Sequence, residues 1–180
     1  MIRYFSVDEE FSGLDHRKND LLSIGIIEIE KRGNKFYPMY NRKLYLELKP
    51  EKEANEESMA INKLNLDNLK KYGINKDNFV REVEKYLNLK NNDKAVFVAY
   101  CGVLDKIFFD QIYQDTNSNN PFDYEIIEIS SLAIGKLGFE WGFTEQDLLT
   151  KLGIPDTNNK HNALDDAILQ ALEFCGIMNY

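Results

Sequence analysis

Cysteine, proline and long apolar runs are all scarce in this sequence of 180 residues. Its two cysteines, Cys101 and Cys175, are too few for a disulfide framework or a Cys/His zinc cluster. We therefore expect a reducing, cytoplasmic setting. No apolar run approaches the roughly 18 residues of a membrane-spanning helix. Acidic residues at positions 8–10 also interrupt the N-terminal stretch before it reaches signal-peptide length, so we expect no membrane partner and no secretory signal.

Basic residues are also in deficit. The chain has 22 lysines and arginines against 30 aspartates and glutamates, which gives a net charge of −8. Proteins that coat or bend duplex nucleic acid are usually basic, so this class is excluded. Two options remain. Either the partner is uncharged or cationic, or bound metal ions reverse the sign of the charge where an anionic substrate meets the protein.

Aliphatic and aromatic residues, by contrast, are plentiful. Hydrophobic residues make up 43% of the chain, with ten tyrosines and eleven phenylalanines, and this content excludes disorder. A chain of this length can bury a sizeable core without disulfide or metal crosslinks. We expect a single domain over residues 1–180.

The hydrophobic pattern predicts five strands and five helices. The strands are expected at Ile2–Asp8, Leu21–Glu30, Phe36–Leu48, Lys94–Ala99 and Tyr124–Ile129. The helices are expected at Asn55–Leu64, Lys76–Leu89, Val103–Tyr113, from Thr144 to Gly153, and Asn162–Cys175. The first three strands follow one another closely, which predicts an antiparallel meander. The fold class is mixed α/β, a five-stranded mixed sheet flanked by helices, in an order that matches a ribonuclease-H-like fold.

Two acids, Asp8 and Glu10, close the first predicted strand. Because side chains alternate across a strand, both face the same side, with Cα atoms about 6.5–7 Å apart. Two carboxylates in one space repel each other unless a cation or a shared proton lies between them. Gly13 follows and allows a sharp turn that brings backbone close to a ligand. Taken alone, a D-x-E pair is more often a solvated strand end.

The last predicted helix carries Asp166 on a face that is otherwise apolar apart from Gln170. Two small residues on this face, Ala163 and Ala167, allow a close approach to the sheet. An ionised aspartate pressed against a sheet needs a partner. His161 stands just before the helix and can lean over the same site as Asp166.

A further acid, Asp105, lies in the first turn of the predicted helix 103–113. Taken alone, it is explained by the helix dipole, which favours acids at this position. The fold gives it another meaning, because one edge of the sheet could gather all four acids, Asp8, Glu10, Asp105 and Asp166. Four carboxylates form a site for hard divalent cations bound through oxygen, Mg²⁺ or Mn²⁺.

Three segments carry a resemblance to a known family. They read SVDEEFSGLD (Ser6–Asp15), VAYCGVLDKIFF (Val98–Phe109) and HNALDDA (His161–Ala167). In this order they resemble the motifs of DEDDh-type 3′–5′ exonucleases of the DEDD superfamily. That group includes polymerase proofreading exonucleases, oligoribonucleases and tRNA-trimming ribonucleases. The resemblance covers nearly the whole chain. Its second segment diverges, since Tyr100 and Cys101 stand where relatives commonly have a His-Asn pair.

The resemblance implies a catalytic role for each acid. Asp8 resembles the acid that bridges two metal ions, and Glu10 and Asp166 resemble ligands of the ion on the nucleophile side. Asp105 resembles the acid that supports the second ion. His161 resembles the general base.

The resemblance also implies that substrate-binding residues follow the first strand. They are Phe11, Ser12, Gly13 and Leu14. Ser12 and Gly13 resemble the turn that contacts the terminal nucleotide, and Leu14 resembles the apolar wedge against its base.

The implied reaction is hydrolysis of phosphodiester bonds from the 3′ end of single-stranded DNA or RNA, with release of nucleoside 5′-monophosphates. Two cations about 3.5–4 Å apart can hold the attacking and leaving oxygens. A histidine such as His161 can take the proton of the attacking water. Two divalent ions also offset four carboxylates, which reconciles an acidic protein with an anionic substrate.

Other functions remain open. One is a non-catalytic nucleic-acid or polymerase-docking module that retains the fold, supported by the divergent Tyr100 and Cys101. Another is a metal-dependent phosphomonoesterase. The chain could also form a homodimer or dock to a larger nucleic-acid machine. The choice between DNA and RNA is not readable, because the 2′-OH is sensed by a few local contacts.

Overall fold

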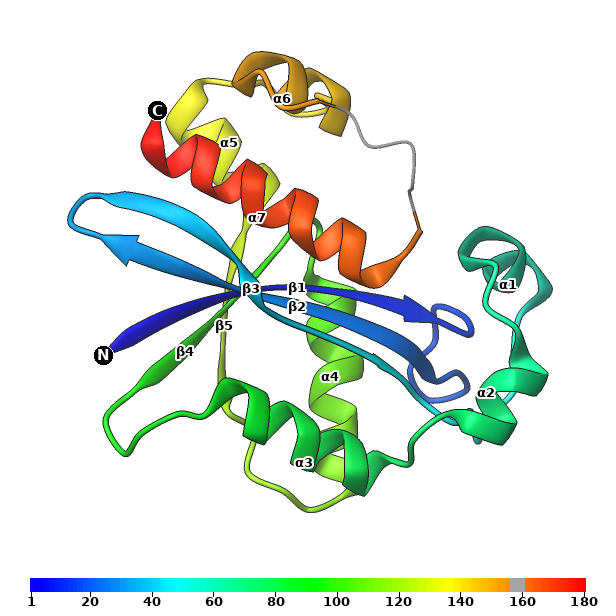
Figure 1. The fold of residues 1–180 in the computed structure, drawn as a ribbon. Helices are drawn as coiled ribbons and strands as arrows, with labels where there is room; N and C mark the ends of the chain where they lie inside the picture. Colours follow the sequence, from blue (N-terminus) through cyan, green and yellow to red (C-terminus); the bar gives the residue numbers. More distant parts are fainter. Residues whose placement is uncertain (156–160) are drawn as a thin grey trace.

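The computed structural model describes residues 1–155 and 161–180, which form a five-stranded mixed sheet flanked by helices (Figure 1). The strands are β1 (Ile2–Phe11), β2 (Leu21–Arg32), β3 (Lys35–Glu47), β4 (Lys94–Ala99) and β5 (Phe122–Glu128). The helices are α1 (Glu56–Asn62), α2 (Leu66–Tyr72), α3 (Lys76–Leu87), α4 (Val103–Asp115), α5 (Ile129–Leu137), α6 (Glu145–Leu152) and α7 (Ala163–Asn179). The predicted mixed α/β class is confirmed.

Strand β1 lies at the centre of the sheet, whose order is β3-β2-β1-β4-β5. The first three strands form the predicted antiparallel meander. Strands β4 and β5 run parallel to β1 and reach their places through helices α3 and α4. This mixed pattern places the C-terminal ends of β1 and β4 at the same end of the sheet.

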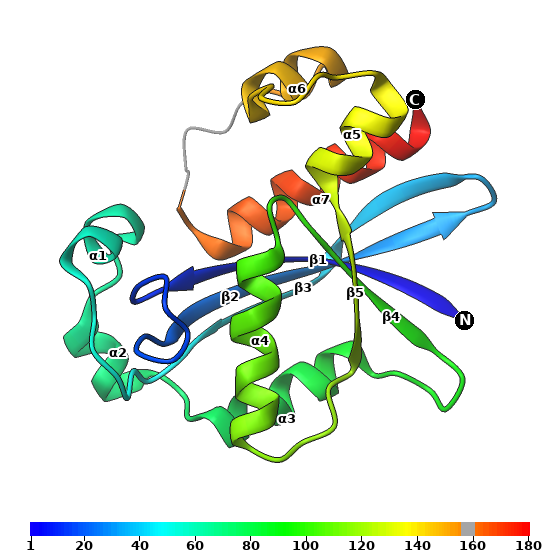
Figure 2. The ribbon, with the colours of Figure 1, turned by 180° about the vertical axis from the view of Figure 1, so that it is seen from behind.

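Two hydrophobic cores sandwich the sheet, because side chains of each strand alternate between its faces. Helices α3 and α4 cover one face, and α5 and α7 cover the other (Figures 1 and 2). Within β1, Phe5 and Val7 belong to the core under α3 and α4, and Tyr4 packs against the core under α7. Two alanines, Ala167 and Ala171, let α7 lie directly on the strands.

Two helices, α2 and α5, went unpredicted. The sequence predicted a strand at Tyr124–Ile129, but the strand ends at Glu128, and α5 begins at the next residue. The Glu128 carboxylate accepts the backbone N–H groups of Ser130 and Ser131, and this cap converts the expected strand end into a helix start. Helix α2 buries only Leu69, which is too little to give a helical hydrophobic pattern.

Within residues 1–155 and 161–180, no helix has the length and the hydropathy needed to cross a bilayer.

Candidate metal centre and active site

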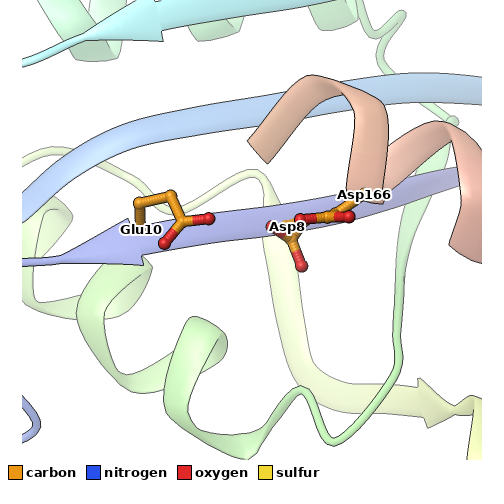
Figure 3. Close-up of side chains that lie close together, drawn as sticks. All are labelled: Asp8, Glu10 and Asp166. Atoms are coloured by element: carbon orange, nitrogen blue, oxygen red, sulfur yellow. The ribbon is translucent and has the colours of Figure 1, made fainter. Parts of the chain in front are cut away.

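Asp8 and Glu10 lie on the part of β1 that extends beyond β4. The parallel pairing of β1 with β4 ends at Ser6 and Val98, whereas the antiparallel pairing with β2 continues to Phe11. Asp8 and Glu10 alternate with residues of the opposite core and therefore lie on the sheet face that α7 covers (Figure 3). Both carboxylates thus lie where β1 has lost its β4 neighbour.

Gly25 brings the start of α7 against this end of the sheet. It is the β2 partner of Asp8, and a Cβ atom placed on it would lie 2.1 Å from the carbonyl oxygen of Ala163. A glycine is required here because any side chain would push the first turn of α7 off the sheet. Asn162 caps this turn. The close approach places Asp166 beside Asp8.

Asp8, Glu10 and Asp166 form the centre of the site. Each offers one carboxylate oxygen, and these oxygens all lie within 4.8 Å of one another (Figure 3). The backbone N–H of His161 donates to Oδ2 of Asp166 at 2.8 Å, from a residue with a φ of 69°. His161 is exposed, so the predicted base lies at the solvent side of the carboxylate cluster.

Asp105 enters the site from the first turn of α4. It is 8% exposed and lies outside the group of three. After burial, its negative charge is among the causes that raise the pKa of Asp8 and of Glu10, so it is a near neighbour of both. Burial raises the pKa of Asp105 itself to about 7, against hydrogen bonds from its own backbone N–H and that of Glu9. All four predicted acids therefore meet at one end of the sheet.

The pKa values show that the cluster resists ionisation. Burial raises the pKa of Asp8 well above its usual value, and the charges of the three other acids raise it further. Burial and the charges of Asp166 and Asp105 raise the pKa of Glu10 to about 7. Burial also raises the pKa of Asp166. Among the described residues, no lysine or arginine forms an ion pair with any of these acids, and His161 is the one positive group that lowers the pKa of Asp166.

The donor set fits a hard divalent cation. Its atoms are carboxylate oxygens, the ligands that Mg²⁺ and Mn²⁺ prefer, rather than sulfur or imidazole nitrogen. A cation would supply the missing positive charge and would stabilise the ionised form of each acid. The metal ligands predicted from the sequence are therefore chemically suited to the group that the family implies.

The end of β1 and the turn after it hold the four predicted substrate-binding residues. The Phe11 ring stacks on Phe108, with ring centroids 4.3 Å apart. Ser12 is fully buried, and its hydroxyl donates to the Glu53 carbonyl oxygen. Gly13 is also buried, and Leu14 is 73% exposed. Of the four side-chain positions, Leu14 alone projects into solvent, and the Ser12 hydroxyl stabilises the turn from inside.

Two neighbours of the site received no role from the sequence. The Gln170 amide Nε2 donates to Oδ1 of Asp8 at 2.6 Å. Glu9 is 5% exposed on the opposite face of β1, and neither of its carboxylate oxygens has a hydrogen-bond partner among the described residues. Gln170 could have been found, because it lies one turn after Asp166 on the same apolar face. Nothing in the sequence marks Glu9 as buried.

Comparison with known proteins defines the class. The family profile described as exonuclease (RNase_T) matches residues 5–174, and the chain belongs to this family. The nuclease domain of 3′hExo, a DEDDh family member bound to rAMP, superposes with a TM-score of 0.76 at 13% identity, over 96% of this chain and 90% of that one. E. coli Exonuclease I with a dT13 oligonucleotide gives 0.71 at 14% identity, over 95% and 40%. The predicted ribonuclease-H-like fold is confirmed.

Two relatives are similar in sequence over most of their length. The chain is 26% identical to the 3′-5′ DNA exonuclease Cap18 of Escherichia coli over 170 residues, 93% of this chain and 87% of the relative. It is 28% identical to Ribonuclease T of Buchnera aphidicola subsp. Cinara cedri (strain Cc) over 183 residues, 96% and 80%. The predicted exonuclease family and enzyme class are confirmed, and the DEDDh family member of known structure shares the fold of this chain.

Proposed function

We propose that this exonuclease hydrolyses single-stranded DNA or RNA from the 3′ end, using two Mg²⁺ or Mn²⁺ ions, and releases nucleoside 5′-monophosphates. One observation carries the proposal: three carboxylates from β1 and α7 converge within 4.8 Å, beside the buried Asp105. Cations would offset the mutual repulsion of such a cluster, and they would in turn allow an acidic protein to hold a phosphodiester.

The protein's own groups would divide the work. Asp8, Glu10 and Asp166 would hold the first ion, and Asp105, together with Asp8, would hold the second. When bound, the ions would neutralise the phosphate and make the attacking water more acidic. His161, which is exposed beside Asp166, would accept the proton of that water as general base.

The turn after β1 would receive the terminal nucleotide. The exposed Leu14 side chain would pack against its base, while Phe11 and Ser12, held by Phe108 and Glu53, would keep the turn in shape. Gly13 would let the backbone approach the nucleotide; a Cβ atom there would already lie 2.4 Å from atoms of the Asn19 side chain.

The named relatives and structural neighbours support single strands as the substrate. One relative is called a DNA exonuclease and the other a ribonuclease, and the solved structures carry dT13 or rAMP. A net charge of −8 also disfavours strong non-specific binding to duplex. We further propose a single domain over residues 1–180 in a reducing cytoplasm, where the two free thiols would persist.

The test is digestion of matched 5′-labelled DNA and RNA oligonucleotides, single-stranded and duplex, with Mg²⁺ or Mn²⁺. The wild type should give a ladder of shortened products and nucleoside 5′-monophosphates. Asp8→Asn should abolish the ladder. Asp165→Asn, in the same helical turn as Asp166 but outside the carboxylate cluster, is the matched control and should digest normally.

Three outcomes would contradict the proposal. The first is a wild type that binds oligonucleotides without cleaving them, which would favour the non-catalytic module. The second is an Asp8→Asn variant as active as the wild type. Hydrolysis of a generic phosphomonoester without digestion of any oligonucleotide would favour a phosphomonoesterase.

A further inference from the structure

Gln170 joins β1, which supplies Asp8 and Glu10, to the loop after β4 that leads to Asp105. It lies on α7, four residues after Asp166, and is 6% exposed. Its Nε2 donates to Oδ1 of Asp8 at 2.6 Å, and its Oε1 accepts the backbone N–H of Tyr100 at 3.1 Å. We infer that Gln170 is a positioning residue for the proposed metal centre, on which this inference rests: it fixes the Asp8 carboxylate and its spacing from the loop that leads to Asp105.

The chemistry of the two partners fixes the orientation of the amide. An ionised carboxylate can only accept a hydrogen bond, and a backbone N–H can only donate one. The Gln170 nitrogen must therefore face Asp8, and its oxygen must face Tyr100. The glutamine amide satisfies both partners because it offers a donor and an acceptor at once. With Oδ1 of Asp8 held in this way, the second oxygen of that carboxylate has a defined direction.

The position of the bridge explains its purpose. Backbone pairing between β1 and β4 ends at Ser6 and Val98. Two residues further along each strand, Asp8 would face Tyr100, and this is the pair that Gln170 connects. The side chain thus replaces the strand pairing at the point where β1 and β4 stop contacting each other.

The hydrogen bond between Gln170 and the Tyr100 backbone also restrains the loop that leads to the fourth acid, Asp105. Tyr100 directly follows β4, and Asp105 lies five residues later in the first turn of α4. The next residue, Cys101, is held on its other side, because its backbone N–H donates to Oε1 of Glu128 at 2.9 Å. The loop between β4 and α4 is therefore held by hydrogen bonds to Gln170 of α7 and to Glu128 of β5. Of these two residues, Gln170 is the one that also contacts a predicted metal ligand, Asp8.

Two substitutions separate the two hydrogen bonds. Gln170→Glu keeps the acceptor for the Tyr100 N–H but turns a carboxylate toward Asp8. Gln170→Met keeps the length and removes both bonds. Cys175→Ala is the control, because Cys175 is buried on the same helix but packs in the core under α5 and α7.

Three measurements decide the inference: Mn²⁺ binding by calorimetry, kcat at saturating Mn²⁺, and thermal unfolding in EDTA. Both Gln170 variants should lower kcat or Mn²⁺ affinity by about 10–100-fold, the usual effect of losing a group that orients a metal ligand. Cys175→Ala should alter the melting temperature and leave the Mn²⁺ response unchanged. A Gln170 variant with wild-type kcat and wild-type Mn²⁺ affinity would overturn the inference.

The calorimetric arm keeps this test separate from the proposed function. If the wild type proves inactive on every oligonucleotide, the proposed function fails. In that case weaker Mn²⁺ binding by the Gln170 variants still supports the bridge, and equal binding overturns it. If Gln170→Met does not fold, the isosteric Gln170→Glu carries the same comparison.

Discussion

At the scale of single residues, carboxylates that are buried beside one another raise the free energy of the metal-free folded protein. Glu10 shows this most directly, because burial and the charges of Asp166 and Asp105 raise its pKa to about 7. At a pH above that value, the folded state must hold Glu10 ionised against its neighbours. The same groups become favourable ligands once a cation lies between them.

We predict that Glu10→Gln stabilises the metal-free protein and inactivates the enzyme. The gain in free energy of unfolding at pH 8 should be roughly 1 kcal/mol, less than the pKa shift implies because the side chain is partly exposed. Turnover should fall by more than about 100-fold, since a ligand should matter more than the groups that orient it. Thermal unfolding in EDTA and oligonucleotide digestion measure the two effects.

The control for Glu10→Gln is Asp165→Asn, which removes a charge from α7 without entering the carboxylate cluster. It should change neither quantity by a comparable amount. A metal-free Glu10→Gln protein that melts below the wild type would show that the cluster is not repulsive.

We predict that His161→Asn separates catalysis from metal binding. His161 has a φ of 69°, which asparagine tolerates, and the backbone N–H that donates to Asp166 is retained. Removal of a general base should slow turnover by about 10²–10⁴-fold. Mn²⁺ affinity, measured by calorimetry, should remain near that of the wild type. Loss of both together would mean that His161 acts on the metal site rather than on the proton.

At the scale of elements, helix α7 organises the site. Its first turn carries Asp166, its second carries Gln170, and its alanines lie on the sheet. The approach depends on Gly25 of β2, where a Cβ atom would lie 2.1 Å from the carbonyl oxygen of Ala163. A helix shifted at this end would carry Asp166 away from Asp8.

We predict that Gly25→Ala both destabilises the protein and impairs Mn²⁺ binding, because the first turn of α7 must move. Gly135→Ala is the matched control. Gly135 lies within α5, and a Cβ atom there meets nothing within 4 Å. The control should be neutral or more stable by up to about 1 kcal/mol, the ordinary helix preference for alanine. Equal effects of the two substitutions on Mn²⁺ affinity would contradict this role of Gly25.

The elements with a strong hydrophobic period were the ones that could be predicted. Helix α3 buries one face, with Phe79, Val83 and Leu87 at helical spacing, and β1 is rich in aromatic and β-branched residues, so both follow from the sequence alone. Helix α5 could not be predicted, because its start depends on the Glu128 side chain turning back onto the next residues. Helix α2 buries only Leu69 and has no apolar stripe. The position of such helices depends on capping side chains and on packing against neighbouring elements, and not on a periodic hydrophobic pattern.

At the scale of the whole molecule, the sequence predicts which acids face the site. It does not predict the contacts that hold the helix and strands carrying them in place. Alternation along a strand and the spacing of a helix fix which face Asp8, Glu10 and Asp166 share. The docking at Gly25 and the reach of Gln170 to Tyr100 join parts of the chain that are far apart in sequence. No local pattern records such contacts.

The whole molecule and the site both carry negative charge. The chain carries a net charge of −8, and its acidic cluster lies at one end of the sheet without a lysine or arginine ion pair among the described residues. Surface acids such as Asp15, which is paired with Arg17, are satisfied by neighbours. A divalent cation bound at this cluster would therefore lower the electrostatic free energy of the folded protein.

We predict that the metal-free protein loses stability as the pH rises from about 5 to about 8. The pKa values of Glu10 and Asp105 are about 7 in the folded state, against ordinary values of 4.5 and 3.8. Between these values the folded state binds more protons than the unfolded state, so the free energy of unfolding falls with rising pH. The contribution is complete below about pH 4 and is lost as the pH passes through about 7.

Bound Mn²⁺ should reverse this pH dependence, so that the free energy of unfolding rises with pH. Mn²⁺ binds the ionised carboxylates, so its stabilisation should grow as the pH rises and reach about 2.7 kcal/mol at a free concentration of 100 times its Kd. Chemical denaturation at several pH values, in EDTA and with Mn²⁺, measures both slopes. The double variant Glu10→Gln with Asp105→Asn should make the EDTA curve less steep, because it removes two groups with a pKa of about 7 while Asp8 and Glu9 still bind protons in the folded state. Wild-type stability in EDTA that stays level or increases toward pH 8 would mean that these carboxylates do not repel one another in the folded protein.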